Sequence, residues 1–245
     1  MSLRYIKEKE KDKQTYIAIG DIHGCHRELN HLLTVLEDEY DLSDPRVQMI
    51  FLGDYIDRGD SSLQVINKLL EIQKKYPQTV FLKGNHEQSF LEDEIRTFND
   101  IPRPTPEYIT RFFESCPIYY ETPDFLFIHG GPANFDSDLS KELEGDLLWN
   151  YIPDTQGWKG KTVVKGHTAV KKPTQLGNVL YLDSGCCFGG SLSCAIINGQ
   201  TSAIEEFKQI HRVQFGGENR RKMISKKEIV IIGLERRSNN TYKKI

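Results

Sequence analysis

The sequence predicts an α/β fold built on parallel strands, and two observations support this prediction. Short apolar runs rich in β-branched and aromatic residues recur along the chain, and helical patterns follow the first three of them. Each run is followed directly by a short motif containing Gly with Asp, Asn or His. Alternating strands and helices bring successive strand ends to one edge of a sheet, where ligands of such sheets gather. We therefore expect residues that are far apart in the sequence to converge on one site.

The individual elements can be followed along the chain. Apolar runs at residues 16–19, 49–52, 80–82, 125–128 and 163–164 are typical of short buried strands. Helical spacing follows in three sets: Leu29, Leu32, Leu33, Leu36; Leu63, Ile66, Leu69, Leu70; and, more weakly, Leu91, Ile95, Phe98. Alternating prolines exclude a regular helix from residues 99–106, which we interpret as a surface loop. The later β-rich segments at 179–183, 193–198 and 202–207 predict a second sheet, and residues 229–232 predict one more strand.

Length and charge indicate one catalytic domain with two flanking segments. The chain has 245 residues and no internal linker, repeat or low-complexity stretch. We expect a charged N-terminal segment over 1–14, a catalytic domain over 15–207 and a basic C-terminal extension over 208–245. Residues 206–245 hold 11 basic and 4 acidic residues. This tail is either a solvated basic segment or a docking segment for an acidic partner, and no nucleic-acid-binding motif accompanies it.

The composition excludes several locations and site types. No apolar run approaches the roughly 20 residues of a membrane-spanning helix, and residues 1–14 lack the apolar region of a secretory signal. The five cysteines are odd in number and show no C-x-x-C spacing, which argues against a disulfide framework or a cysteine zinc site. We therefore expect reduced thiols in a cytoplasmic protein that does not contact membranes.

Five motifs supply candidate metal ligands. They read Gly20-Asp21-Ile22-His23-Gly24, Gly53-Asp54-Tyr55-Ile56-Asp57-Arg58-Gly59, Gly84-Asn85-His86-Glu87, His129-Gly130-Gly131 and Gly166-His167. Each motif has a structural explanation on its own, because a Gly-Asp pair after a strand is usually a turn and a lone His is often a hydrogen-bonded core residue. Five such motifs at five predicted strand ends favour a shared metal site. The candidate ligands are Asp21, His23, Asp54, Asn85, His129 and His167.

The types of these ligands predict the metals and the chemistry. Carboxylate, imidazole and amide groups suit Mn, Fe or Zn. We expect two divalent ions and favour Mn²⁺ over Fe or Zn as their identity. Asp54 has two carboxylate oxygens and can bridge both ions. Two ions about 3.5–4 Å apart can activate a shared water and bind the oxygens of a phosphoryl group.

In these motifs the chain resembles the phosphoprotein phosphatase family of calcineurin-like metallophosphoesterases. The family signature is G-D-x-H-G, G-D-x-x-D-R-G and G-N-H-E, followed by two later His residues, and the match spans residues 17–197. The resemblance implies an α/β fold of four layers (α/β/β/α), in which helices flank a central β-sandwich. It also implies hydrolysis of phosphate monoesters by a metal-bridging hydroxide, without a phosphoenzyme.

The resemblance also implies a role for each motif residue. His86 would protonate the leaving oxygen as general acid, with Asp57 orienting its ring. Arg58 would hold the phosphate with its planar donor fork, and Glu87 would have a supporting role. One ion would be bound by Asp21, His23 and Asp54, and the other by Asp54, Asn85, His129 and His167.

The chain departs from the family pattern at one position. Family members usually carry a second phosphate-binding Arg soon after a Trp. Here Trp149 is followed by Asn150, and no Arg occurs between Arg111 and Arg212. The second cation is either lost or supplied by another group, for which the candidates are Lys159, Lys161 and Arg111.

The motif details favour one substrate class over another. The chain length and the segment 186–190 resemble the bacterial and phage branch of serine/threonine protein phosphatases, and Asp57 and Glu87 match the protein-phosphatase form of the motifs. We therefore expect hydrolysis of phosphoserine and phosphothreonine in proteins, with phosphotyrosine also accepted. The alternatives are a phosphorylated small molecule, with the chain acting as a symmetrical bis(5'-nucleosyl)-tetraphosphatase, and a low-turnover phosphate-binding protein. His86 and Asp57 argue against the last alternative, because binding alone needs no general acid.

Overall fold

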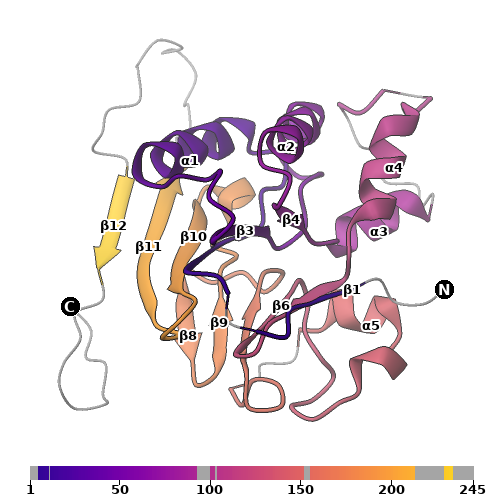
Figure 1. Cartoon of the computed structure of the whole chain (residues 1–245). Helices are drawn as coiled ribbons and strands as arrows, with labels where there is room; N and C mark the ends of the chain where they lie inside the picture. The colour runs from indigo at the N-terminus through magenta and orange to yellow at the C-terminus, as the bar shows by residue number, and fades with distance from the viewer. Residues whose placement is uncertain are drawn as a thin grey trace.

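The fold has four layers, with two six-stranded sheets facing each other and helices on their outer faces (Figure 1). The computed structural model describes residues 5–10, 12–92, 100–102, 104–151 and 155–212, together with the backbone of 229–233. The arrangement confirms the expected α/β/β/α architecture. The elements are β1 (Tyr5–Lys7), β2 (Thr15–Ile19), α1 (His26–Glu39), β3 (Val47–Phe51), α2 (Ser62–Lys75), β4 (Val80–Phe81), α3 (Asn85–Leu91), α4 (Glu107–Ser115), β5 (Tyr119–Glu121), β6 (Phe125–Ile128), η1 (Leu139–Lys141), α5 (Glu144–Trp149), β7 (Thr162–Lys165), β8 (Thr174–Leu176), β9 (Val179–Tyr181), η2 (Cys186–Phe188), β10 (Ser191–Asn198), β11 (Ile204–His211) and β12 (Ile229–Gly233).

The predicted parallel strands exist, but they belong to two sheets. One sheet has the order β12-β11-β10-β2-β3-β4, and the other has the order β1-β5-β6-β7-β9-β8. Strands β2, β3 and β4 are parallel to one another, as are β6, β7 and β9. The later β-rich segments do not form a separate sheet: β9 pairs with β7, whereas β10 pairs antiparallel with β2 and is followed by β11. Pairing partners are set by contacts distant in sequence, so local patterns did not predict this division.

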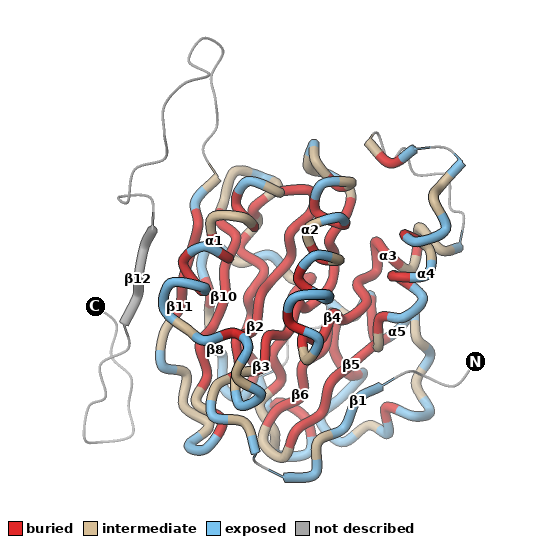
Figure 2. The backbone as a smooth tube through the Cα atoms, turned by 45° about the horizontal axis from the view of Figure 1, so that its top comes forward, coloured by how far each residue is buried: buried red, intermediate tan, exposed pale blue. Residues whose placement is uncertain are grey.

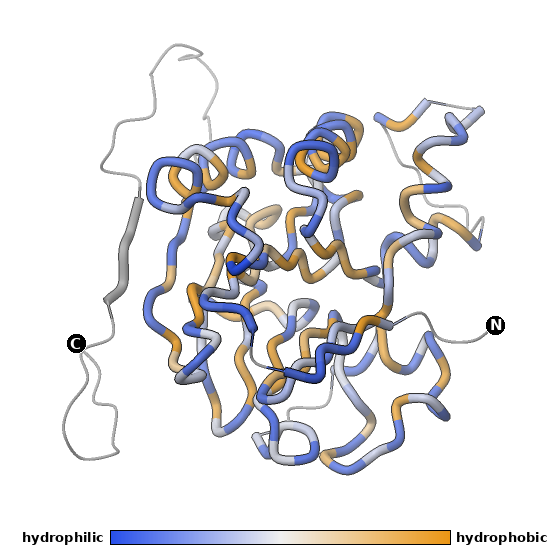
Figure 3. The backbone as a smooth tube through the Cα atoms, viewed as in Figure 1, coloured by the Kyte–Doolittle hydropathy of each residue, from blue (hydrophilic) through white to orange (hydrophobic). Residues whose placement is uncertain are grey.

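Side-chain alternation along the strands produces the layered core. In β2, Ile17 and Ile19 face the helices, whereas Tyr16 and Ala18 face the second sheet. This period of two is what a strand buried on both faces requires. Figure 2 shows the buried strands beneath α1 and α2, and Figure 3 shows that apolar residues concentrate in the strands and on one side of these helices.

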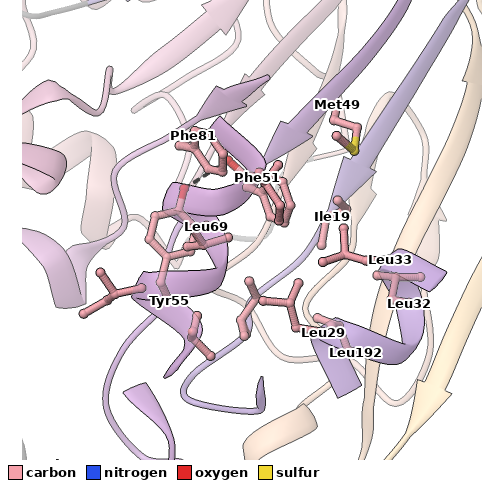
Figure 4. Packing of buried hydrophobic residues seen from close by; sticks show 14 of the residues in the cluster. Ile19, Leu29, Leu32, Leu33, Met49, Phe51, Tyr55, Leu69, Phe81 and Leu192 are labelled. Atoms are coloured by element: carbon pink, nitrogen blue, oxygen red, sulfur yellow. Dashed lines mark hydrogen bonds between the residues drawn. The ribbon is translucent and has the colours of Figure 1, made fainter. Parts of the chain in front are cut away.

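The helices pack where the leucine spacing predicts. All four leucines expected on the buried side of α1 are 3% exposed or less. Leu29 and Leu33 pack in one cluster with Ile19 of β2, and Phe51 stacks on Phe81 with ring centroids 5.1 Å apart (Figure 4). Helix α3 ends at Leu91, and the other two residues expected on it, 95 and 98, lie outside the described residues. Among the described residues, no helix combines the length and apolarity needed to cross a bilayer.

The two flanking segments contribute strands to the sheets. Strand β1 pairs in parallel with β5, so part of the charged segment 1–14 forms a sheet edge. The boundary expected after residue 207 falls inside β11, where Lys208 and Ile210 are 0% and 2% exposed. Strand β12 pairs antiparallel with β11, which confirms the strand predicted at 229–232. The first sheet therefore extends into the basic region of the chain.

Candidate metal centre and phosphate site

Five strands deliver the motif residues to one region. Asp21, Asp54, Asn85, His129 and His167 each follow the end of a different strand, namely β2, β3, β4, β6 and β7. All five are 8% exposed or less. Because these strands are parallel within each sheet, their carboxyl ends lie at the same edge of the sandwich. The structure thus brings together residues separated by up to 146 positions.

Asp54 occupies the centre of the site. Its Oδ2 lies 3.3 Å from His23 Nε2, and its Oδ1 lies 3.3 Å from His129 Nε2. Burial disfavours the charged carboxylate, but His129 and His23 outweigh this effect and hold the pKa of Asp54 well below its usual value. Each oxygen therefore faces a different group of ligand atoms, as bridging two ions requires.

Backbone carbonyls orient the two histidines that face Asp54. His23 donates from Nδ1 to the Ile56 carbonyl at 2.9 Å, and His129 donates from Nδ1 to the Leu52 carbonyl at 2.8 Å. A donated Nδ1–H leaves the Nε2 lone pair of each ring directed at the centre. Both rings therefore direct a nitrogen lone pair at the centre, as a metal ligand would.

The donor atoms of the second group fit a divalent cation. His129 Nε2 lies 2.9 Å from Asn85 Oδ1, so two lone-pair atoms face each other in a buried space. Nε2 of His167 and Nδ2 of Asn85 are buried without a hydrogen-bond partner. Buried polar atoms are normally paired, and a bound ion would engage the lone-pair atoms. One atom from each of Asp54, His129 and His167 lies within 4.8 Å of the others, and the same holds for His23, Asp54 and His86.

Asp21 lies beside the group of ligands that contains His167. Its carboxylate accepts a hydrogen bond from the backbone N–H of His167 at 3.0 Å. A Cβ at Gly166 would lie 2.1 Å from Asp21 Oδ1, so this close approach requires glycine. Burial and the carboxylates of Asp183 and Asp54 raise the pKa of Asp21 well above its usual value. Three buried carboxylates repel one another at this site, and divalent cations would relieve the repulsion.

Asp183 is a site residue that the motifs did not identify. It follows β9, is 4% exposed, and accepts a hydrogen bond from the Gly185 backbone at 2.9 Å. Like Asp21 and Asp54, it is an Asp at the end of an apolar run, but Leu182 rather than Gly precedes it, so the sequence contained only part of the signal.

His86 and Asp57 form a polar pair beside the ligands. Nδ1 of His86 donates to Asp57 Oδ2 at 2.8 Å, and this hydrogen bond lowers the pKa of Asp57 to about 2. The carboxylate thus fixes the ring so that Nε2 of His86 points inward, where it is buried without a hydrogen-bond partner. Nε2 lies 3.8 Å from Asp54 Oδ2. This geometry suits a ring that holds a proton for a group entering the site.

Arg58 lies at the exposed edge of the same region. One guanidinium nitrogen is 3.0 Å from His23 Nε2, and the guanidinium lies over the ring of Phe188, 5.4 Å from its centroid. An exposed guanidinium beside the ligands can bind an incoming phosphate with two donors.

Glu87 holds the loop that carries Asp54. It is fully buried; Oε2 accepts hydrogen bonds from the backbone N–H groups of Asp54 and Gly84 at 2.9 Å, and Oε1 accepts from those of Tyr55 at 2.8 Å and Ile56 at 3.4 Å. Burial and the neighbouring Asp54 raise the pKa of Glu87. The supporting role expected for this residue is therefore a clamp on the backbone around the bridging carboxylate.

The backbone of the site is strained at five positions. His23, Asp54, Asp57, Arg58 and His167 have φ values of 45°, 53°, 72°, 67° and 61°. Only seven non-glycine residues have positive φ in the described part of the chain, and these five all belong to the motifs. Such conformations persist when surrounding contacts enforce them, and they cluster at functional sites.

The cations expected to replace a second Arg are engaged elsewhere. Lys161 binds Glu121 at 2.7 Å, Arg111 binds Glu107 at 2.5 Å, and the Nζ of Lys159 lies 4.8 Å from the Trp158 ring centroid. The structure instead places buried Lys165 next to Asn150, whose carbonyl accepts a hydrogen bond from its Nζ at 3.1 Å.

These features define a metal-dependent phosphoesterase: two carboxylate-bridged groups of ligands, an oriented histidine and a guanidinium at the strand ends of a four-layer sandwich. Residues 15–214 match the model of the calcineurin-like phosphoesterase family, and the chain belongs to this family.

Related proteins support the family and differ in their named activities. A bis(5'-nucleosyl)-tetraphosphatase PrpE [asymmetrical] from Anoxybacillus flavithermus is 28% identical over 218 residues, covering 73% of this chain and 88% of the relative. The corresponding protein of Halalkalibacterium halodurans is 29% identical over 215 residues, covering 71% and 87%. Among solved structures, one provisionally named a diadenosine tetraphosphatase has a TM-score of 0.64 and 19% identity, covering 85% of this chain and 98% of that chain. A cold-active protein-tyrosine phosphatase of Shewanella sp. has a TM-score of 0.59 and 18% identity, covering 85% and 80%.

Proposed function

We propose that this chain is a metal-dependent hydrolase that cleaves dinucleoside tetraphosphates asymmetrically, into a nucleoside monophosphate and a nucleoside triphosphate. The observation that carries the reaction class is the convergence of Asp54, both groups of ligands and His86 in one buried site. The substrate is supported by the relatives named bis(5'-nucleosyl)-tetraphosphatase, which match most of the chain. The motif details favour phosphoproteins, with a symmetrical dinucleotide hydrolase as the alternative, whereas the relatives' names favour the asymmetrical cut.

Each residue of the site has a separate role in phosphate hydrolysis. Divalent ions bound here would supply a water of lowered pKa and neutralise phosphate charge. Asp54 lies between the two groups of ligands with one oxygen toward each, and Glu87 holds the backbone of Asp54 in place. Arg58 binds the phosphoryl oxygens, and His86, oriented by Asp57, holds a proton on Nε2 for the leaving oxygen.

A second candidate is a phosphoprotein phosphatase, and the His86–Asp57 pair favours it. Cleaving a phosphoserine ester expels an alkoxide, which needs a proton as the bond breaks. Cleaving a tetraphosphate expels a nucleoside triphosphate, which is stable as an anion and needs that proton far less. An oriented acid is therefore more valuable for a protein substrate than for a dinucleotide.

The two candidates are separated by comparing substrates and by removing the acid. The Mn²⁺-loaded protein is assayed with diadenosine tetraphosphate and with phosphoserine and phosphotyrosine peptides at one pH and ionic strength, and the products are separated by chromatography. We expect a higher kcat/KM for the dinucleotide and equal yields of AMP and ATP. Two molecules of ADP would identify the symmetrical alternative, and a preference for a phosphopeptide would replace the proposal with the second candidate.

The variant His86→Asn adds an independent reading. Loss of a general acid costs about 10²–10⁴ in rate where the leaving group needs a proton. We expect a loss in that range for a phosphoserine peptide and a much smaller loss for the dinucleotide. Equal losses on both substrates would show that His86 acts on something other than the leaving group.

A further inference from the structure

The loop after β9 holds an aromatic ring in solvent beside the phosphate site. Phe188 ends the short turn η2 and is 66% exposed. The loop is closed by backbone hydrogen bonds from Phe188 and Gly190 to the Gly185 carbonyl at 2.9 and 3.0 Å. Gly185 and Gly189 have φ values of 67° and 89°, so left-handed glycines flank the turn. The exposure of this ring is therefore built into the backbone of the loop.

The exposed ring is coupled to the residue that binds phosphate. The Arg58 guanidinium lies 5.4 Å from the Phe188 centroid, and Arg58 is also 3.0 Å from the Nε2 of His23. Phe188, Arg58 and the ligand His23 thus form a continuous path from solvent into the site. A single exposed aromatic residue needs no explanation on most surfaces, but this one borders a cationic phosphate-binding group.

Building on the proposed function, we propose that Phe188 is the stacking surface for the nucleobase of the nucleoside whose phosphate Arg58 holds. Aromatic rings stack on any base, which suits a surface that carries no polar group to read base identity. A ring this close to the guanidinium is within reach of a base one ribose away from the bound phosphate. When the polyphosphate chain is extended, a base separated from it by three further phosphates lies beyond the ring.

This placement explains an asymmetrical cut. If the phosphorus next to the ribose is the one at Arg58, water attacks that phosphorus and the anhydride bond to the second phosphorus breaks. The electron pair leaves with the nucleoside triphosphate, and the nucleoside monophosphate remains between Arg58 and Phe188. The oxygen of the attacking water stays on the nucleoside monophosphate, and both protons of that water are released once the two products carry fully ionised terminal phosphates.

A simpler role for Phe188 would be to orient Arg58, and binding measurements distinguish the two roles. Calorimetric titration of the Mn²⁺-loaded protein with AMP and with inorganic phosphate separates base contacts from phosphate contacts. For Phe188→Ala we expect AMP binding to weaken about tenfold, with phosphate binding changed by less than about twofold. Phe188→Trp should restore AMP binding because it keeps an aromatic face. Phe135→Ala is a matched control, since Phe135 is also exposed, at 48%, and lies outside the motifs.

Two results would overturn the inference. Equal weakening of AMP and phosphate would show that Phe188 only orients Arg58, and unchanged AMP binding would show that no base rests on the ring. The proposed function is judged separately by dinucleotide turnover in the unmodified protein. If no dinucleotide is cleaved but AMP binding depends on Phe188, the proposed substrate fails and the base-stacking surface stands.

Discussion

Replacing Glu87 with Gln tests whether the clamp on the Asp54 loop holds the metal centre together. The two side chains have nearly the same shape, so the substitution changes hydrogen bonding with little change in packing. Both carboxylate oxygens of Glu87 accept hydrogen bonds from buried backbone N–H groups, two at Oε2 and two at Oε1, of which the one from Ile56 is long at 3.4 Å. A carboxamide has a single acceptor oxygen, so whichever way it turns, its NH₂ group faces at least one backbone N–H.

The magnitude follows from that count. A hydrogen bond to a charged group contributes about 1.5–3 kcal/mol, and a buried N–H left unpaired costs about 1–3 kcal/mol. Removing the negative charge relieves repulsion with Asp54, which raises the pKa of Glu87, and this relief offsets part of the loss. We expect the free energy of unfolding of the metal-free protein to fall by about 2–3 kcal/mol. Because Asp54 sits at φ 53° and depends on its neighbours, Mn²⁺ affinity should fall by about 10–100-fold, as for other residues that orient a ligand.

Urea denaturation in the presence of chelator and Mn²⁺ titration of the native variant measure the two effects. Glu71→Gln is the control, because Glu71 is 69% exposed and its ion pair with Lys68 lies on the surface of α2. This control should change stability by less than about 0.5 kcal/mol and leave Mn²⁺ affinity unaltered. A Glu87→Gln variant with the stability and Mn²⁺ affinity of the unmodified protein would refute the clamp.

Three further predictions address metal, pH and chain length. Asp54→Asn should lower Mn²⁺ affinity by more than about 100-fold and abolish most turnover, because the Asp54 side chain faces both groups of ligands. Elemental analysis and activity assays after chelation test this, and full activity without metal would contradict it. Burial raises the pKa of Glu121, but hydrogen bonds from two lysines outweigh burial and leave the folded-state pKa below the unfolded value of about 4.3. The contribution of Glu121 to stability is therefore present above roughly pH 4.3 and is lost as pH falls through the lowered folded-state pKa. Glu121→Gln should make stability fall less steeply at acid pH, and an unchanged acid limb of the stability–pH profile would show that other groups control it. A chain ending at Phe207 should lose cooperative thermal unfolding because it lacks buried Ile210, whereas a chain ending at Arg212 should fold and hydrolyse aryl phosphates. Equal behaviour of the two truncated chains would show that the second half of β11 is not needed for folding.

Much of the site could be predicted because its signals are local. A short apolar run followed by Gly-Asp, Gly-Asn or Gly-His marks a strand and the residue at its end, so Asp54 and His129 could be placed without knowing how the strands pair. Convergence then followed from the geometry of parallel strands. The division into two sheets depends on which strand pairs with which, and the antiparallel pairing of β10 with β2 leaves no trace in either segment alone.

The features that escaped prediction arise from contacts between distant segments. Glu87 clamps a loop that precedes it by more than thirty residues, and nothing in its own motif indicates that both oxygens would be used there. Phe188 is a large apolar residue of the kind usually found in the core, yet glycines with left-handed backbone on both sides of the turn place it in solvent. Asp183 ends an apolar run like the other aspartates, but its signal was weaker because no Gly precedes it.

The left-handed backbone at the site sets stability and activity against each other. A residue other than glycine loses roughly 1–2 kcal/mol in this conformation, so glycine at Asp57 or Arg58 would relieve strain while removing a side chain to which the proposed mechanism assigns a role. A laboratory selection for thermal tolerance alone would therefore favour glycines at these positions and yield sturdier, inactive proteins. Stabilising this protein for practical use should begin away from the motifs, for instance at exposed positions of α1 and α2, with turnover monitored in every round.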